Sequence, residues 1–343
     1  MKKNISLVFT LIFLVLNVAC NKDDLSKITD IVIKASKNNV LVDEPIRFIA
    51  MGDNGRDVTN ETVFYVNDEK IEGHVFSPSQ AGIIKVKGIY KGIESNVLQI
   101  SVKTPTGYTQ KVLVEDYTGV WCGYCPRVAY AIEQIKANPD FGGKMIPVAI
   151  HLFSHNDPFT CADGTALKDA FNINGLPQGR INKTNVWTAP QPDHLDDVYN
   201  FIGGDAPLGI AINSAVTDGN IDVSVRVGFA QDFNHLGLVI YLLEDGLIHD
   251  QTNYTSYFGG AYTLQNFEHN DVLRKVYTDI LGDPIPASQS VANHIYTYTL
   301  NAPLPTNVVH TDRLKLVVFV VDKTTNEAIN VQSVHLGENQ SFD

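Results

Sequence analysis

The sequence predicts a multidomain chain, α/β plus all-β, in which an α/β segment lies between two β-sandwiches. Residues 28–103 and 205–343 consist of short runs that alternate apolar and polar residues and are separated by turn-forming residues. This pattern is typical of β-sandwiches. Residues 108–204 instead alternate strand-like runs with segments whose apolar residues recur at helical spacing. That order predicts an α/β layer.

The first residues of the chain form an export signal. A basic start precedes a mostly apolar run from Ile5 to Leu16, which is too short to span a bilayer. Cys20 follows two small residues, so we expect a signal peptide over residues 1–19 and lipid on the Cys20 thiol. Ordinary cleavage beside a stray cysteine is the alternative. Because two or more acyl chains anchor a protein stably, residues 20–27 are expected to be a lipidated tether.

Composition excludes several kinds of partner. The net charge is −12 and no basic run interrupts it, so nucleic acid and anionic membrane surfaces are poor partners. No later stretch has 18 continuous apolar residues, so membrane contact is expected through the anchor alone. Three cysteines remain besides Cys20, which is too few for a disulfide-stapled scaffold.

The first all-β segment carries its own resemblance. Strands are expected in ITDIVIKA, EPIRFIAMG, TVFYVN and IIKVKGIY. The closing phrase KGIYKGIESNVLQISVK resembles the last strands of bacterial immunoglobulin-like modules, which implies an immunoglobulin-like β-sandwich over residues 28–103. Residues 104–107 are expected to be a linker. In the C-terminal sandwich, residues 249–290 fit strands poorly, so a long loop or short helices are expected there.

The motif WCGYC carries most of the chemistry. Cys122 and Cys125 are two residues apart where a strand-like run gives way to a helical pattern at Pro126. There the first sulfur would lie exposed at a helix N-terminus, which favours the thiolate. The second sulfur would be close enough to attack a mixed disulfide. The spacing therefore predicts a redox pair.

Two alternatives to a redox pair stay open. A zinc site needs about four ligands, and the candidates nearby, Cys161, His151 and His155, are not spaced to converge on one ion. We therefore expect no metal and no cofactor. The second alternative is an inert, permanently closed disulfide in a fold that has lost its activity.

The block KVLVEDYTGVWCGYC resembles the thioredoxin superfamily signature. This resemblance implies a thioredoxin-like domain over residues 108–204, with Asp116 as the buried acid that relays a proton to the interior cysteine. Alternation along a strand places only one of Glu115 and Asp116 inward, so a solvated strand-end carboxylate is the other interpretation of Asp116. FNINGLPQGRIN resembles the segment where a cis-proline opens the next strand, which would make Leu176 and Pro177 face the sulfurs.

The thioredoxin resemblance also assigns roles. It implies a Cys122–Cys125 disulfide in the oxidised protein, with Cys122 as the nucleophile and Cys125 as the resolving thiol. Asp116 and Pro177 complete the predicted catalytic set. The residues expected to contact substrate are Trp121, Gly123, Tyr124 and Leu176.

A broader resemblance covers roughly residues 108–343. The order of tether, EDYTGVWCGYCP block, insertion beginning HLFSHNDPF, G-L-P turn and C-terminal sandwich is similar to the outer-membrane-protein-28-related lipoproteins of Bacteroidota. The NKDD that follows Cys20 resembles the acidic tag of lipoproteins sent to the cell surface. Together these imply a lipid-anchored protein of the outer membrane, with surface exposure favoured over periplasmic exposure.

Two functions follow from these observations. The first is a thiol–disulfide oxidoreductase whose partners are thiols and disulfides of envelope or extracellular proteins. The second is a surface binding or adhesion lipoprotein in which the thioredoxin-like fold is a non-catalytic scaffold. The length of the two all-β segments and the acidic charge favour the second, and four aromatic residues are candidates for its contact surface: Tyr254, Tyr257, Phe258 and Tyr262.

Overall fold

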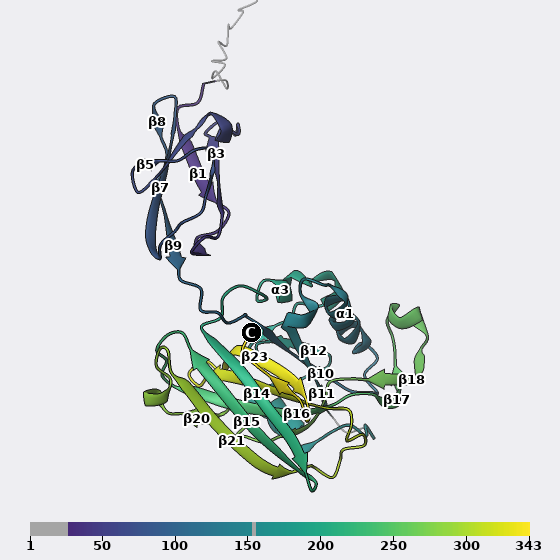
Figure 1. Cartoon of the computed structure of the whole chain (residues 1–343). Helices are drawn as coiled ribbons and strands as arrows, with labels where there is room; N and C mark the ends of the chain where they lie inside the picture. Colours follow the sequence, from purple (N-terminus) through teal and green to yellow (C-terminus); the bar gives the residue numbers. More distant parts are fainter. Residues whose placement is uncertain (1–26, 153–155) are drawn as a thin grey trace, which may run out of the picture. The chain divides into compact units, whose positions relative to one another are not determined.

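The computed structural model describes residues 27–152 and 156–343 (Figure 1). The chain divides into two compact units, the first ending at Thr104 and the second running from Pro105 to Asp343. The predicted signal peptide and lipidation site, Cys20, lie outside the described residues. Within those residues, no helix is both long and apolar enough to cross a membrane.

The first unit is built from two sheets that share one core. Every second residue of β3 (Ile46–Gly52) is buried, and Phe48 of this strand lies 5.6 Å from Phe64 of the other sheet, centroid to centroid. Alternating burial of this kind produces a sandwich; its immunoglobulin-like character stays a prediction. The remaining strands are β1 (Ile31–Ala35), β2 (Asn39–Leu41), β4 (Val63–Val66), β5 (Glu69–Lys70), β6 (Val75–Phe76), β7 (Gly82–Tyr90), β8 (Ile93–Glu94) and β9 (Leu98–Lys103).

A nine-stranded sheet forms the centre of the second unit. Its strands are β10 (Val112–Thr118), β11 (Met145–His151), β12 (Gln178–Ile181), β13 (Asn185–Val186), β16 (Leu236–Glu244), β19 (Val272–Val276), β20 (Asp283–Ile285), β22 (Leu314–Asp322) and β23 (Glu327–His335). Their order is β13-β12-β10-β11-β19-β16-β22-β23, with β20 beside β16. All residues of β10 and β16 are buried, because both faces of the sheet are covered.

Helices cover one part of this sheet and a second sheet covers another. Helix α1 (Pro126–Ala137) packs its buried face, which the helical spacing predicted, against Val112 and Val114 of β10. A four-stranded sheet in the order β21-β15-β14-β24 shares a core with β16 and β22. The other elements here are α2 (Ala162–Ala170), α3 (Asp196–Tyr199), β14 (Leu208–Thr217), β15 (Asn220–Phe229), β21 (Ile295–Pro303) and β24 (Asn339–Gln340).

A two-stranded hairpin lies beside α1 in Figure 1. It consists of β17 (Leu247–Thr252) and β18 (Thr263–His269), and residues 247–269 are called the arm below. The ring of Tyr257 in the arm stacks on Tyr130 of α1 at 4.6 Å between centroids. The short 3₁₀ helices of the chain are η1 (Thr59–Glu61), η2 (Gly142–Lys144), η3 (Gln191–Asp193), η4 (Tyr257–Gly260) and η5 (Ala287–Gln289).

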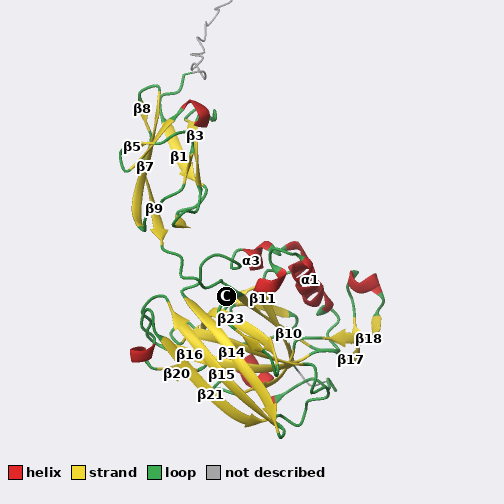
Figure 2. Ribbon diagram, viewed as in Figure 1, coloured by secondary structure: helices red, strands yellow, loops and turns green. Residues whose placement is uncertain are grey.

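The predicted fold class is wrong. Within the described residues there are 24 strands but only three α-helices, of 12, nine and four residues, so the chain is mostly β (Figure 2). No separate thioredoxin-like α/β domain stands over residues 108–204, since β11 continues the sheet into β19 through the pair Ala149 and Val272. Local periodicity could not reveal this pairing, because it joins segments more than 120 residues apart. Residues 249–290, where a loop or helices were expected, supply most of β17 and all of β18, β19 and β20.

Both acidic residues of β10 are buried, on opposite faces of the sheet. Glu115 faces the core that includes Tyr117 and Tyr241, and it accepts hydrogen bonds from Lys183 Nζ at 3.0 Å and Tyr241 Oη at 3.1 Å. The expectation that only one of Glu115 and Asp116 points inward is therefore wrong. It presumed that one face of the strand is exposed to solvent, whereas both faces of this sheet are covered. Burial lowers the pKa of Lys183, and the nearby Glu115 carboxylate opposes that change.

We expect Lys183→Met to lower the free energy of unfolding by about 3–5 kcal/mol, because it leaves the Glu115 charge buried without a counter-ion. Urea unfolding monitored by circular dichroism measures the change. The double variant Glu115→Gln/Lys183→Met should recover a large part of the loss. Equal stability of the single and double variants would show that the pair is not coupled.

Candidate functional site

Cys122 and Cys125 form a disulfide in the loop between β10 and α1, with 5.4 Å between their Cα atoms. The loop is a turn closed by the Cys125 N–H, which donates to the Cys122 carbonyl at 3.2 Å. Pro126 opens the helix directly afterwards, where its missing N–H costs nothing. Cys122 is 5% exposed and Cys125 is 1% exposed, so the first cysteine is not the accessible sulfur that the motif predicted.

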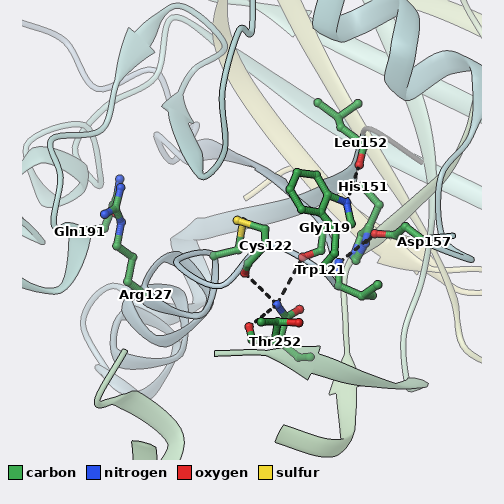
Figure 3. The surroundings of a disulfide bond; sticks show 12 residues. Gly119, Trp121, Cys122, Arg127, His151, Leu152, Asp157, Gln191 and Thr252 are labelled. Carbon is green, nitrogen blue, oxygen red and sulfur yellow. Dashed lines mark hydrogen bonds and ion pairs between the residues drawn. A yellow bond between two sulfur atoms is a disulfide. The ribbon is translucent and has the colours of Figure 1, made fainter. Parts of the chain in front are cut away.

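The arm covers this loop. The Tyr254 N–H donates to the Gly123 carbonyl at 2.7 Å, and the Thr252 N–H donates to the Val120 carbonyl at 2.9 Å. Figure 3 shows the carbonyls of Gly119, Cys122 and Thr252 around one amide nitrogen, which is Nε2 of Gln251. The arm therefore binds the disulfide loop through its backbone as well as its side chains.

Gly123 is in van der Waals contact with a tyrosine of the arm. A methyl group added at residue 123 would lie 2.3 Å from a ring carbon of Tyr254, so a side chain at this position would displace the arm. Tyr124 is exposed and meets the Tyr254 ring edge-on at 5.6 Å between centroids. Of the predicted substrate-contacting residues, Gly123 is thus covered and Tyr124 is open.

Asp116 lies on the same cavity as one of the two cysteines. It lines a cavity of about 90 Å³ together with Cys125, His151 and His269. Asp116 is 3% exposed, and its Oδ1 has no hydrogen-bond partner in the part of the chain that the structure describes. Burial raises the pKa of Asp116 to about 8, against a smaller opposing effect of Arg127. Burial, with a contribution from His151, lowers the pKa of His269 to about 3, so these two groups are neutral at neutral pH.

Sequence reasoning missed Asp157, which ties the insertion to the disulfide loop. Its Oδ2 accepts from the Val120 N–H at 2.9 Å and lies 2.8 Å from His151 Nδ1 (Figure 3). Burial alone would raise the pKa of Asp157, but the hydrogen bond and charge of His151 and the N–H groups of Phe159 and Val120 outweigh it and lower that pKa. The Trp121 indole N–H donates to the Leu152 carbonyl at 3.3 Å, so the insertion holds the loop at two points.

The residues considered as zinc ligands, His151, His155 and Cys161, are not shown together at one site. His151 is engaged by Asp157, and His155 lies outside the described residues. Cys161 is a free cysteine at the start of α2, where its Sγ accepts from the Gly164 N–H at 3.4 Å and burial raises its pKa. In residues 27–152 and 156–343, no group of three or more His, Cys, Asp or Glu side chains is arranged to hold a metal ion.

Pro177 follows a cis peptide bond with Leu176. The next residue, Gln178, pairs with Tyr117 at the end of β10, so the proline turn and the disulfide loop leave the same end of the sheet. Leu176 and Pro177 line a hollow with Trp187 and Thr188, which does not include either cysteine. The structure thus brings Asp116 to the disulfide and places Leu176 and Pro177 in a neighbouring hollow.

We expect Asp116→Asn to stabilise the protein at alkaline pH. Below about pH 4 the carboxyl is protonated in both the folded and the unfolded state, so it does not affect stability. Between about pH 4 and 8 it ionises only in the unfolded state, which lowers the free energy of unfolding as the pH rises. At pH 9 the variant should be more stable by up to about 5 kcal/mol. Urea unfolding between pH 4 and 9 tests this, with Asp218→Asn on the surface as the control. The same pH dependence in wild type and Asp116→Asn would contradict it.

Comparisons with known proteins match parts of this chain. The sequence profile of the family described as outer membrane protein Omp28 matches residues 164–340. HBP35 of Porphyromonas gingivalis has a similar structure, with a TM-score of 0.52 and 16% identity over 67% of this chain and 76% of that one. A domain of the outer membrane lipoprotein Omp28 from Porphyromonas gingivalis gives a TM-score of 0.26 and 23% identity over 40% of this chain and 92% of that one. No curated protein matches.

Proposed function

Because this chain belongs to the Omp28 outer membrane protein family, we propose that it is a lipid-anchored binding protein of the outer membrane. In this proposal the segment that carries Cys122 and Cys125 is a scaffold and not a catalyst. The observation that supports it best is that the disulfide is closed and buried, and that the arm is bonded to the backbone of its loop. Membership also confirms the outer-membrane location expected from the sequence.

The extent of the family match favours the same view. Residues 164–340 include the arm and most of the strands of the second unit. They do not include the Cys122–Cys125 loop. The family match therefore lies in the mostly β part of this unit and gives no support to a catalytic role for the cysteine pair.

A patch of tyrosines offers a contact surface for a partner. Tyr124, Tyr254 and Tyr262 are 54%, 51% and 67% exposed. The Tyr254 ring lies 5.6 Å from Tyr124 and 5.3 Å from Tyr262, centroid to centroid. Exposed aromatic groups that cluster mark interaction surfaces, because tyrosine combines apolar area with a hydroxyl. Backbone hydrogen bonds between the loop and the arm would hold this patch in place.

In this proposal the lipid anchor and the first unit connect the tyrosine patch to the membrane. Lipid on Cys20 would hold the chain at the membrane. The first unit, which lies between the tether and the patch along the chain, would act as a spacer. The occupant of the tyrosine patch would be an envelope or extracellular protein.

Thiol–disulfide exchange is the second candidate function, and one observation favours it. The Cys122–Cys125 pair lies at the N-terminus of α1, and Asp116, with a raised pKa, lines the same small cavity as Cys125. Once an envelope dithiol has reduced the pair, the Cys122 thiolate would attack a substrate disulfide and release one substrate thiol. Cys125, after giving its proton to Asp116, would then attack Cys122, release the second substrate thiol and close the Cys122–Cys125 disulfide again. Pro177 and Leu176 would hold the substrate, with Trp121 and Tyr124.

Redox trapping separates the two candidates. We expect the wild-type disulfide to resist a glutathione buffer, and Cys125→Ser to capture no mixed disulfide with envelope proteins, because Cys122 is covered. Alkylation followed by mass spectrometry measures both, with Cys122→Ser as the control. Ready reduction together with capture by Cys125→Ser alone would establish exchange in place of the scaffold role.

Binding is tested by lysine cross-linking to envelope proteins in whole cells. The scaffold role predicts that the double variant Cys122→Ser/Cys125→Ser captures the same partners as the wild type, whereas Tyr262→Ser loses them. If the double variant loses its partners while Tyr262→Ser keeps them, the contact depends on the cysteines and the proposal fails.

Tyr254→Ala should accelerate reduction of the disulfide by dithiothreitol about three- to tenfold. The variant removes the ring that covers Gly123, and an aromatic contact of this kind contributes about 0.5–1.5 kcal/mol to holding the arm closed. Free thiols are counted over time by alkylation. Tyr262→Ala is the matched control, because Tyr262 lies in the same patch. Equal rates in the two variants would show that the arm does not protect the sulfurs.

A further inference from the structure

Strand β21 ends the four-stranded sheet and is paired on one side only. All nine of its residues pair with β15, and no strand among the described residues pairs with its other edge. The other nine-residue strand that ends a sheet in this unit, β23, is mostly buried. No residue of β21 is buried; they alternate between exposed and half-buried. Figure 1 shows β21 at the outer border of its sheet.

The sequence of this edge lacks the usual protection. Natural edge strands are kept from pairing by charges, prolines, bulges or short length. β21 reads IYTYTLNAP, which has no charged residue, and its single proline is the last residue. Its register with β15 runs without a bulge from Ile295 to Pro303. A long, regular and uncharged edge is a template for another strand.

The side of β21 that faces the core is also incomplete. Tyr296, Tyr298, Leu300 and Ala302 pack against the core of the two sheets, yet all four remain half-buried. The Tyr298 hydroxyl donates to Asp283 Oδ2 at 2.9 Å, which fixes that ring under the strand. A further strand beside β21 would remove the remaining apolar surface of these four residues from water.

We propose that β21 pairs antiparallel with β21 of a second copy of this chain, about a two-fold axis at Thr299. This register places Tyr296 opposite Ala302 and Tyr298 opposite Leu300, so that a large side chain meets a smaller one in each pair. An interface about a two-fold axis must be self-complementary in this way. The result is one continuous sheet of eight strands across two copies.

The charges beside the edge fit a second copy. On β15, Arg226 pairs with Thr297 and Asp222 pairs with Asn301. The two-fold register sets Thr297 opposite Asn301 of the second copy, so Arg226 lies in the same cross-strand row as Asp222 of that copy. Like charges therefore do not face one another. Copies held on one membrane by lipid would also meet at a high effective concentration.

Cysteine cross-linking of the full-length lipoprotein in its membrane tests the register. Residues directly opposite in an antiparallel pair have Cα atoms about 4.5–5.5 Å apart, within the range of a disulfide. Thr299→Cys should therefore give a covalent dimer under mild oxidation. Thr297→Cys, on the same exposed face, should not, because its equivalent in the second copy is displaced by four residues, or about 13 Å. Co-expression of Thr297→Cys with Asn301→Cys chains should restore the covalent dimer.

A second variant tests the pairing without a cross-link. Thr299→Lys places two like charges at the axis and should lower the dimer fraction of the detergent-solubilised protein at least tenfold, measured by light scattering. Thr217→Lys, at the exposed end of β14, is the matched control, and urea unfolding confirms that both variants fold. Equal cross-linking of Thr299→Cys and Thr297→Cys, a monomeric wild type, or a cross-link of Thr299→Cys to another protein instead would overturn the proposal.

Discussion

A carboxylate and an ammonium group lie together in the interior of the second unit and join segments that are far apart in the chain. Glu115 comes from β10, Lys183 from the turn after β12, and Tyr241, which bonds both, from β16. Desolvating such a pair is costly, and hydrogen bonds such as those with Tyr241 offset part of that cost. The pair links the part before residue 205 to the part after it. It adds to the sheet pairing of β11 with β19, through which the cysteine segment continues into the rest of the unit.

Single helices and strands of the second unit could be predicted from the sequence, whereas the pairing of distant strands into one sheet could not. The helical spacing of Val128, Ala131 and Ile135 predicted the buried face of α1, and the apolar run at residues 145–151 forms β11. The link from β11 to β19 depends on residues that are more than 120 positions apart. No periodicity in either strand encodes its neighbour, so a resemblance over a short block suggested a domain boundary that does not exist.

At the candidate site, too, some features could be predicted from the sequence and others could not. The C-x-x-C spacing predicted that Cys122 and Cys125 lie together, and the acid six residues before Cys122 is buried beside Cys125. Asp157 was missed because a single aspartate in an insertion carries no motif, although its bonds to Val120 and His151 place the loop. The arm was missed because polar residues interrupt its strands. Both missed features decide how far the sulfurs are open to a partner.

The contact between Gly123 and Tyr254 has a consequence for variation in this protein. In a C-x-x-C pair the two middle residues ordinarily adjust the redox potential, and they are free to vary because they face solvent. Here the arm occupies the space above residue 123, so of the two only the exposed position 124 has room for side chains of different size. Diversity between the cysteines is therefore expected to be confined to one position wherever the arm is kept, and a larger residue at 123 should occur only together with a shortened or altered arm.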